Sequence, residues 1–387
     1  MISEIAAVVF LASVAFCAYT IAGYPLLLGL LARWRGRAIH KAPMHVPVSI
    51  IMPVHNGERW IGQKLESIAS LRYPPELVEV LIADDGSTDR TRSIVGQFNG
   101  PDTLRLLAVP RGGKAAALNA AIEQASGEIL FFTDVRQALH PDSLASLVAC
   151  FSDPEVGVAS GELMIAPGAD QEQASVGMYW KYEKFIRKNL SRLDSIPGAT
   201  GCIYAMRRSL ARPLPADTLV DDMYLPITAF FAGYRVILDE GARAFDYPTQ
   251  LASEFRRKVR TLAGVCQVIH QFPGLLGPRN RMWIHFVSHK LARLIMPWTL
   301  MSAACATWFM AEPWNFWAGA AQAFGYGLGV VDPLVPDRWL LKRLTSPART
   351  FMVLMVAALL AISVAFVPAR KLWGETKVSG THAGGES

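Results

Sequence analysis

Residues 5–31 are almost wholly apolar and contain no Asp, Glu, Lys or Arg. A helix of that length extends about 40 Å, enough to cross a hydrocarbon layer of roughly 30 Å with some tilt. A secretory signal peptide carries its basic residues before a short apolar core. Here the basic residues come after the segment, at Arg33, Arg35, Arg37 and Lys41. We therefore expect an uncleaved membrane anchor, with the N-terminus outside and the following chain in the cytoplasm.

The overall composition excludes several classes of protein. Hydrophobic residues make up 52% of the 387 residues and charged residues 18%. Ordinary soluble chains carry about 25% charged residues, so this chain is too apolar to be purely soluble or disordered. The five cysteines form no CxxC pair, which argues against a zinc knuckle or a disulfide framework. The net charge of +6 fits basic flanks of membrane helices or an anionic ligand. We expect no nucleic-acid partner, because no segment interleaves basic and aromatic residues over a long face.

Three further apolar segments lie near the C-terminus, at 294–310, 316–334 and 351–367. The basic link between the last two predicts a cytoplasmic loop, so four spans would place the C-terminus outside. The glycine-containing middle segment is alternatively a re-entrant or interfacial helix. The expected organisation begins with an anchor at 1–32 and a cytosolic domain at 33–283, which includes interfacial helices from about residue 254. C-terminal membrane helices at 284–370 and a flexible tail at 371–387 follow.

The cytosolic part alternates strand and helix signals. Apolar, β-branched runs predict buried strands at 46–54, 78–83, 104–109 and 129–132. Helical spacing and capping residues predict helices at 60–71, 89–98 and 114–125. Strands that alternate with helices form right-handed βαβ units. The expected fold class is therefore α/β with a mostly parallel sheet.

Polar and turn residues follow three of these strands. Pro53, Asp85 and Asp134 each fall at the carboxyl end of a predicted strand. In parallel sheets ligands bind beyond those ends, so we expect the three residues at one site. A single acidic residue after a strand is usually a turn or cap, but the contexts DDGS and FFTD together favour a site. No GxGxxG or GxxxxGK[ST] pattern supports a dinucleotide fold or a P-loop.

Five segments, taken in order, resemble the family 2 glycosyltransferases: IIMPVHNGERW, LIADDGSTD, GGKAAALNAAI, ILFFTD and VDDMYLPITAFFAGYRV. The resemblance covers about residues 46–269 and implies a GT-A fold that uses nucleotide-activated sugars. The membrane layout, with one anchor before and several after, is similar to the hyaluronan, chitin and poly-N-acetylglucosamine synthase branch.

The resemblance implies roles at the donor site. Pro53 and Glu58 match the loop that borders the nucleotide base, and Asp85 matches the residue that accepts from the uracil imide. Lys114 begins a predicted helix after two glycines. A lysine beside a helix N-terminus suits phosphate oxygens, although a solvated helix start is the alternative.

Asp134 matches the first acid of the family's DxD motif, which binds a divalent metal on the diphosphate. The resemblance implies Mg²⁺ or Mn²⁺, hard cations that prefer oxygen ligands. The second acid is replaced, because the sequence reads Asp134-Val135-Arg136. One carboxylate can hold a metal whose other ligands are phosphates and water. Alternatively Arg136 supplies positive charge.

Asp221 and Asp222 match the motif that contains the family's general base, and Asp222 is the predicted base. An inverting transfer needs a group that takes the acceptor hydroxyl proton. Asp221 is expected near the acceptor, and a helix cap is the alternative. Gly198 and Gly201 match the loop beneath the acceptor, where glycine permits close approach of the backbone.

Arg257 and Arg260 stand where processive relatives have QxxRW. As i,i+3 neighbours of a helix they share one face, and two guanidinium groups suit a diphosphate. The alternative is a basic interfacial helix that touches anionic lipid. The chain has Arg257 and Thr261 in place of the Gln and Trp of that motif, which disfavours a long processive polymer.

The sequence therefore predicts an inverting glycosyltransferase in a bacterial inner membrane, with its catalytic domain in the cytoplasm. It is expected to move a sugar from a nucleotide sugar, favoured as a UDP-sugar, to a membrane-associated glycan or a lipid-linked acceptor. The product would serve exopolysaccharide, capsule or glycolipid synthesis. Membrane lipids and a second copy or secretion-complex subunits are the other expected partners. The alternative is a non-catalytic nucleotide-binding component of a polysaccharide secretion complex.

Overall fold

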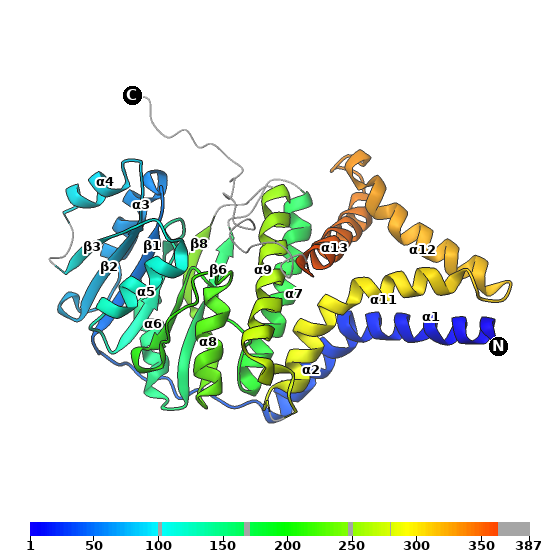
Figure 1. The fold of residues 1–387 in the computed structure, drawn as a ribbon, viewed down its shortest axis with the longest axis horizontal. Helices are drawn as coiled ribbons and strands as arrows, with labels where there is room; N and C mark the ends of the chain where they lie inside the picture. Colours follow the sequence, from blue (N-terminus) through cyan, green and yellow to red (C-terminus); the bar gives the residue numbers. More distant parts are fainter. Residues whose placement is uncertain (100–102, 166–170, 247–250, 279, 363–387) are drawn as a thin grey trace. The chain divides into compact units, whose positions relative to one another are not determined.

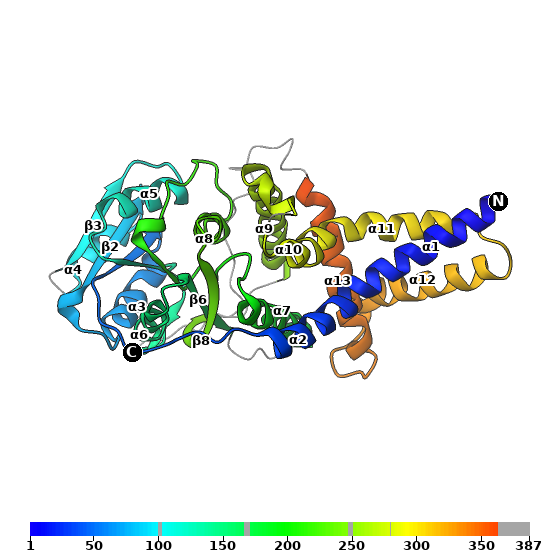
Figure 2. The same ribbon diagram turned by 90° about the horizontal axis from the view of Figure 1, so that it is seen from below.

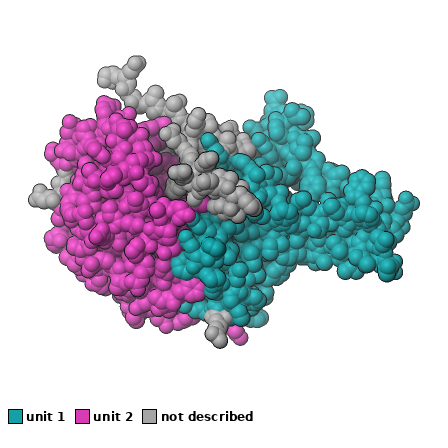
Figure 3. Space-filling model, in the orientation of Figure 1, with its two compact units in different colours: residues 1–34, 167–189, 248–387 teal, residues 35–166, 190–247 magenta. Residues whose placement is uncertain are grey.

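The computed structural model describes residues 1–99, 103–165, 171–246, 251–278 and 280–362. The chain divides into two compact units, shown in different colours in Figure 3. Unit 1 contains residues 1–34, 167–189 and 248–387, and unit 2 contains residues 35–166 and 190–247. The expected flexible tail at 371–387 lies outside the described residues.

Unit 2 is built on a sheet of eight strands within the described residues, in the order β3-β2-β1-β4-β7-β6-β8-β5. The first half follows the predicted strands closely, because each is a short run of apolar side chains that is buried in the sheet. The strands are β1 (Val48–Val54), β2 (Val78–Asp85), β3 (Leu104–Val109), β4 (Ile129–Phe132), β5 (Ala138–Leu139), β6 (Val156–Ile165), β7 (Tyr204–Arg207) and β8 (Arg235–Asp246).

The sheet is mixed but mostly parallel, as expected, because four of the seven pairings among the described strands are parallel. Strands β1 to β4 pair in parallel, as βαβ units require. Strand β7 then runs antiparallel to both β4 and β6, and β5 runs antiparallel to β8. Antiparallel pairing needs no crossover helix. In this half β6 and β8 are the longest strands, with 10 and 12 residues, and they pair in parallel.

Helices cover both faces of the sheet in unit 2 (Figures 1 and 2). Alternate β1 side chains pack with apolar residues of α3 (Glu58–Ala69) and α6 (Ser143–Ala149) in one core. Helix α5 (Lys114–Gln124) lies on the other side of the sheet in Figure 2. The unit also contains α4 (Thr91–Gln97), α8 (Asp221–Phe231) and the 3-10 turns Pro75–Leu77, Cys150–Ser152 and Arg208–Leu210.

Unit 1 is helical throughout its described residues. Its N-terminal helix runs from Ile2 to Arg35 through α1 (Ile2–Ala18), a π-helical turn and α2 (Tyr24–Arg35). Most of α7 (Gln171–Leu193) belongs to this unit. The remaining helices are α9 (Leu251–Gln271), α10 (Trp283–Phe286), α11 (Ala292–Thr307), α12 (Trp314–Val331) and α13 (Lys342–Ala361). The short turns are Tyr19–Gly23, Pro273–Leu276, Val287–Leu291 and Asp332–Leu334.

Two helices within the described residues are long and apolar enough to cross a membrane, namely Ile2–Arg35 and Lys342–Ala361. The expected count of three C-terminal spans is therefore not confirmed. Helix α11 continues from α10 through the π-helical turn Val287–Leu291, and the joined segment Trp283–Thr307 contains Lys290, Arg293 and two histidines, which lower its apolar character. Helix α12 has 18 residues and contains four glycines and two amides, which lower its apolar character.

Candidate active site

One ammonium group joins two of the predicted site carboxylates in unit 2. The Lys114 Nζ lies 3.0 Å from the Asp134 Oδ1 and 3.1 Å from the Asp221 Oδ1. The Asp221 side chain is 10% exposed, whereas that of Asp134 is 37% exposed. The structure therefore brings together the turn after β4, the start of α5 and the start of α8.

Local sequence explains how these groups are placed. Gly113 precedes α5 with a φ of 87°, a left-handed conformation that favours glycine. Lys114 is then the first residue of the helix. Asp134 follows the end of β4 after one residue, and Asp221 is the first residue of α8. The alternative in which Asp221 caps the helix is not observed, because Val220 is the cap residue and the Asp221 carboxylate contacts Lys114. The predicted place of Asp221 at the acceptor stays a prediction.

The charge of Lys114 is held in place by its neighbours. Burial works against the ammonium form, but Asp134, Asp221 and Asp222 outweigh it and raise the pKa of Lys114 above its usual value. A raised pKa keeps the group protonated at all physiological pH values. The site thus contains one fixed positive charge among three carboxylates.

The Asp222 segment packs directly against the predicted acceptor loop. The Ala199 backbone N–H donates to the Asp222 carbonyl oxygen at 2.7 Å. A Cβ placed on Gly201 would lie 2.9 Å from the Asp222 Oδ2, and one on Gly198 would lie 3.3 Å from the Asp222 carbonyl oxygen. Glycine at these two positions therefore lets the loop approach the carboxylate.

We expect Gly201→Ala to lower kcat about tenfold or more while it leaves nucleotide affinity unchanged. The new methyl group would displace the Asp222 carboxylate, and misplacement of a reacting group by about 1 Å can cost roughly a hundredfold in rate. Steady-state kinetics and calorimetry with the nucleotide measure the two quantities. Gly62→Ala is the matched control, because a Cβ there meets no atom within 4 Å. Equal losses in both variants would contradict this expectation.

Asp85 is engaged with the loop that leads into α5. Its Oδ1 accepts from the Gly112 N–H at 2.7 Å and from the Gly113 N–H at 2.9 Å, and its Oδ2 pairs with Arg111. The side chain is 4% exposed. The carboxylate therefore anchors the Gly-Gly turn before Lys114, and the predicted contact with a nucleotide base stays a prediction.

We expect Asp85→Ala to weaken UDP binding by about 10- to 150-fold, because hydrogen bonds to a charged group contribute about 1.5–3 kcal/mol. Loss of the carboxylate would release the turn at Gly112 and Gly113 as well as any contact with the base. Titration calorimetry with UDP measures the change. An affinity unchanged within error would remove Asp85 from the nucleotide site.

Two further residues predicted at the donor site are Pro53, in β1, and Glu58, at the start of α3. Pro53 lies in β1, in register with Ala83 of β2. Glu58 begins α3, and its carboxylate accepts from the Arg90 backbone N–H at 3.0 Å. In this structure Glu58 thus ties α3 to the start of α4. The predicted roles of Pro53 and Glu58 at the base stay predictions.

Arg136 does not pair with Asp134. Its Nη2 lies 2.6 Å from the Asp246 Oδ2 at the end of β8, and Gln137 donates to the same oxygen at 2.8 Å. The alternative in which Arg136 neutralises Asp134 directly is therefore not what the side chains show. Residue 136 is turned aside because β4 ends at Phe132, so the strand alternation behind that alternative does not extend to it.

The donor set around Asp134 suits a hard cation with one protein ligand. Carboxylate oxygen is the ligand type that Mg²⁺ and Mn²⁺ prefer, and the Asp134 side chain is more exposed than that of Asp221. Within the described residues there is no group of three or more His, Cys, Asp or Glu side chains that could hold a metal. Phosphate and water oxygens would have to complete the coordination.

Arg257 and Arg260 lie in α9, in unit 1. The Arg257 guanidinium lies 5.6 Å from the ring centroid of Trp180, and the Lys258 ammonium lies 5.4 Å from the same centroid. These cation–π contacts fix the two helices α7 and α9 of this unit together. The predicted contact of the arginines with a diphosphate stays a prediction.

Several residues of this region were not predicted. Arg111 directly precedes the Gly-Gly turn, and the reasoning applied to Lys114 could have included it. Tyr204 stacks on Phe132 at 4.6 Å. Burial, with Asp221 and Asp222 in the vicinity, raises the pKa of Tyr204 well above its usual value. No sequence pattern indicated Tyr204, because its role depends on β7 lying beside β4.

Unit 2 combines a mixed α/β sheet with a cluster in which Lys114 contacts Asp134, after β4, and Asp221, at the start of α8. Residues 49–214 match the model of the family described as Glycosyl transferase family 2. A mannosyltransferase of Pyrobaculum calidifontis, solved with GDP-Man and Mn²⁺, is similar with a TM-score of 0.73 and 25% identity. That comparison covers 92% of this chain and 99% of the mannosyltransferase. Residues 49–214 are therefore similar to a glycosyltransferase family 2 domain.

Similar sequences include the probable glycosyltransferase YdaM of Bacillus subtilis, 24% identical over 250 residues. That match covers 58% of this chain and 56% of YdaM. The beta-monoglucosyldiacylglycerol synthase of Synechocystis is 33% identical over 123 residues, which is 31% of this chain and 26% of the synthase. The chain thus spans about half or less of the length of these curated relatives.

Proposed function

We propose that unit 2 binds a nucleotide sugar and transfers its sugar, with inversion, to an acceptor hydroxyl. The observation that carries this proposal is the cluster of Lys114 with Asp134 and Asp221, set beside Asp222 and the glycine loop. A diphosphate leaving group needs positive charge, and an attacking hydroxyl needs a base. The cluster offers both within one edge of the sheet.

In this proposal Asp222 is the general base. Its carboxylate takes the proton of the acceptor hydroxyl as that oxygen attacks the anomeric carbon. The bond from the anomeric carbon to the diphosphate oxygen breaks, and the nucleoside diphosphate leaves with the bonding electrons. The glycine loop at 198–201 supports this role, because its lack of a side chain at Gly201 lets the loop lie against the Asp222 carboxylate and hold it in place.

Charge on the leaving diphosphate is balanced at Lys114 and Asp134. Lys114 offers a permanent ammonium, and Asp134 would hold the divalent cation, Mg²⁺ or Mn²⁺. A bound cation supplies charge neutralisation at the diphosphate oxygens. The Mn²⁺ bound to the similar mannosyltransferase supports this assignment. Arg257 and Arg260 are proposed as further diphosphate contacts.

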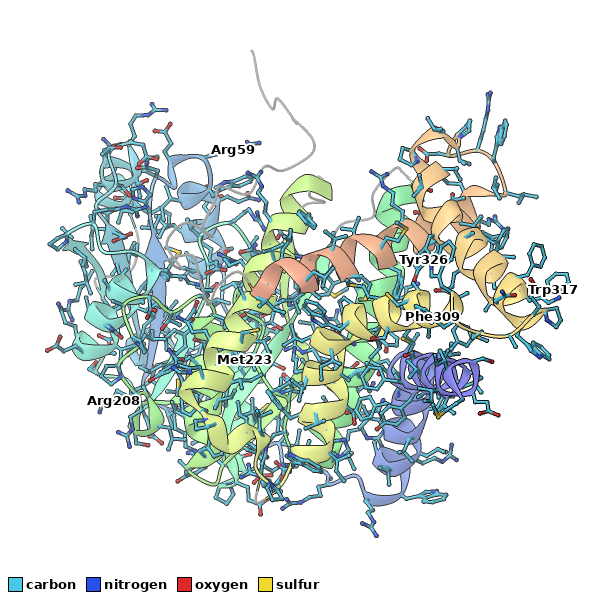
Figure 4. All side chains as sticks on the ribbon, turned by 45° about the vertical axis from the view of Figure 1, so that its right-hand side comes forward. Arg59, Arg208, Met223, Phe309, Trp317 and Tyr326 are labelled. Carbon is cyan, nitrogen blue, oxygen red and sulfur yellow. The ribbon has the colours of Figure 1, made fainter. Side chains whose placement is uncertain are left out.

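We propose a membrane-associated acceptor. The apolar side chains of α1 are exposed at Ile2, Ile5, Val8 and Leu11 by 57–68%, as expected of a helix that faces lipid. The link between α11 and α12, together with the first turn of α12, exposes a group of aromatic side chains, which suit a membrane interface. They are Trp308, Phe309, Trp314, Phe316 and Trp317, of which Phe309 and Trp317 are labelled in Figure 4. The relative from Synechocystis is named a beta-monoglucosyldiacylglycerol synthase, and this name supports a lipid acceptor.

Which donor is used and which product forms distinguish the proposed enzyme from the non-catalytic nucleotide-binding alternative. Purified full-length protein in lipid vesicles would be incubated with radiolabelled UDP-glucose, UDP-N-acetylglucosamine or GDP-mannose. We expect transfer from at least one donor into a lipid-extractable product. A ladder of water-soluble oligomers would instead support the hyaluronan and chitin synthase branch and a growing glycan as acceptor. Nucleotide binding without turnover of any donor would support the non-catalytic secretion component.

We expect the loop at 337–344 to be labelled from the cytoplasmic side of an inner membrane, together with unit 2. The basic residues of the link favour that side. Asp337→Cys, in a background without native cysteines, places a thiol at a side chain that is 54% exposed. Glu312→Cys, between α11 and α12, is the matched site expected outside. A membrane-impermeant maleimide that labels residue 337 from the periplasm would contradict the four-span arrangement.

A further inference from the structure

A lysine is buried on the inner face of α3. Lys64 is 1% exposed and lies on the same helical face as Ile61, Leu65 and Ile68, which are 0%, 1% and 6% exposed. Lysine is almost never fully buried in a soluble core without partners. Burial of an ammonium group is costly unless hydrogen bonds satisfy it. The charged residue on an otherwise apolar stripe therefore needs a reason.

The Lys64 ammonium holds both ends of the segment that carries Asp134. Its Nζ donates to the Thr133 Oγ1 at 2.6 Å and to the Gln137 carbonyl oxygen at 2.5 Å. Asp134 lies between these two contact points in the chain. Lys64, in α3, thus fixes the segment after β4, while Lys114, in α5, contacts the Asp134 carboxylate of that segment.

The same contacts reach the acceptor loop. The Thr133 hydroxyl donates its proton to the Cys202 carbonyl oxygen at 2.8 Å. Cys202 directly follows Gly201, which abuts Asp222. A continuous path of hydrogen bonds therefore runs from Lys64 through Thr133 to the end of the loop that faces the predicted base.

Burial and the neighbouring groups shift the pKa of Lys64 in opposite directions. Burial lowers the pKa of Lys64 to about 7, and Cys202 and Asp134 partly offset that fall. Burial, followed by the charge of Asp134, raises the pKa of the Cys202 thiol to about 12, so the thiol is neutral. The charge of Asp134 thus acts on the pKa values of both Lys64 and Cys202, and the charge of Asp246 also raises the pKa of Cys202.

We propose that Lys64 is a positioning residue that sets the Asp134 segment and the Gly201–Cys202 turn in one fixed arrangement, so that the donor and acceptor sides of the site meet. The inference rests on the proposed function of this same site. A purely structural role is disfavoured on energy, since an apolar side chain of similar volume usually stabilises a core as well as or better than a buried charged group.

The test is Lys64→Met in the full-length protein, assayed with the donor that the wild type uses. We expect kcat to fall about a hundredfold, because a displacement of about 1 Å at the reacting groups can cost that much. Affinity for the nucleoside diphosphate should change less than about threefold, since the Asp85 turn is not part of the path. The midpoint of thermal unfolding should fall, because Lys64→Met leaves the Gln137 carbonyl oxygen without its donor, so kcat is compared at a temperature at which both proteins are folded. Leu65→Met, at a neighbouring site that is 1% exposed, is the control expected to keep turnover.

A second variant tests the path if Lys64→Met does not fold. Thr133→Val keeps the side-chain shape and removes the hydroxyl that joins Lys64 to Cys202. We expect it to lower kcat at least tenfold, and to add little further loss in the double variant with Lys64→Met. Wild-type kcat in folded Lys64→Met, or in Thr133→Val, would overturn the inference while the proposed function stands. A wild type that turns over no donor would contradict the proposed function and this inference together.

Discussion

Asp222→Asn is expected to reduce sugar transfer by about 10²- to 10⁴-fold and to leave nucleotide affinity unchanged. A general base contributes a factor of that order to the rate, and an amide cannot take the acceptor proton. The Asp222 segment is packed against the glycine loop through the Ala199 N–H at 2.7 Å. That contact uses the backbone carbonyl of Asp222, so the substitution preserves it. Single-turnover assays with radiolabelled donor would measure the rate, and calorimetry the affinity.

Asp217→Asn is a suitable control for this experiment. Asp217 is an exposed carboxylate in the same segment before α8, so the substitution makes the same chemical change outside the cluster. Transfer by Asp217→Asn should match that of the wild type. Near-wild-type transfer by Asp222→Asn would show that another group takes the proton. Asp221 would be the next candidate, although its carboxylate is occupied by Lys114.

Removal of divalent metal is expected to abolish turnover despite the missing second acid. Asp134 is 37% exposed at the site, where its carboxylate would repel the diphosphate of the donor. Two like charges about 4 Å apart, at an effective dielectric of about 20, repel by on the order of 4 kcal/mol. We expect excess EDTA to stop transfer, and added Mn²⁺ or Mg²⁺ to restore it. Asp134→Ala should be inactive with or without metal.

The competing account is a site in which protein cations alone balance the diphosphate. Lys114 already contacts Asp134 at 3.0 Å, whereas Arg136 is held by Asp246. Full turnover in excess EDTA, together with an active Asp134→Ala and an inactive Lys114→Met, would contradict the metal requirement. Arg136→Ala distinguishes the role of Arg136 from that of Lys114. It is expected to free the Asp246 carboxylate and to leave the contact of Lys114 with Asp134 in place.

The sequence predicted the strands β1 to β4 and the helices between them, because short apolar runs, helical spacing and turn residues mark these elements. The strands at 104–109 and 129–132 were predicted with their observed bounds, because each is an apolar run ended by a turn. Lys114 was correctly placed at a helix start, since glycine at a positive φ marks that turn. The mixed half of the sheet was not predicted. Its pairings join strands that are distant in sequence, and no periodicity encodes such contacts.

The site could be predicted in membership but not in its contacts. Asp134, Asp221 and Lys114 were each recognised from their own motif, yet nothing local indicates that one ammonium joins the two carboxylates. The direction of Arg136 depends on Asp246 at the far end of β8. Lys64 was missed because its signal, a charge on the buried face of a helix, becomes visible only when the core is known.

The stereochemistry of transfer tests the central claim most directly. The wild-type protein would be supplied with an α-linked donor such as UDP-glucose, or GDP-mannose if that donor is used, and the anomeric configuration of the isolated product determined by NMR. Direct attack by a hydroxyl that Asp222 deprotonates, on the face opposite the leaving diphosphate, predicts a β-linked product. An α-linked product would contradict single-step inverting transfer at this site.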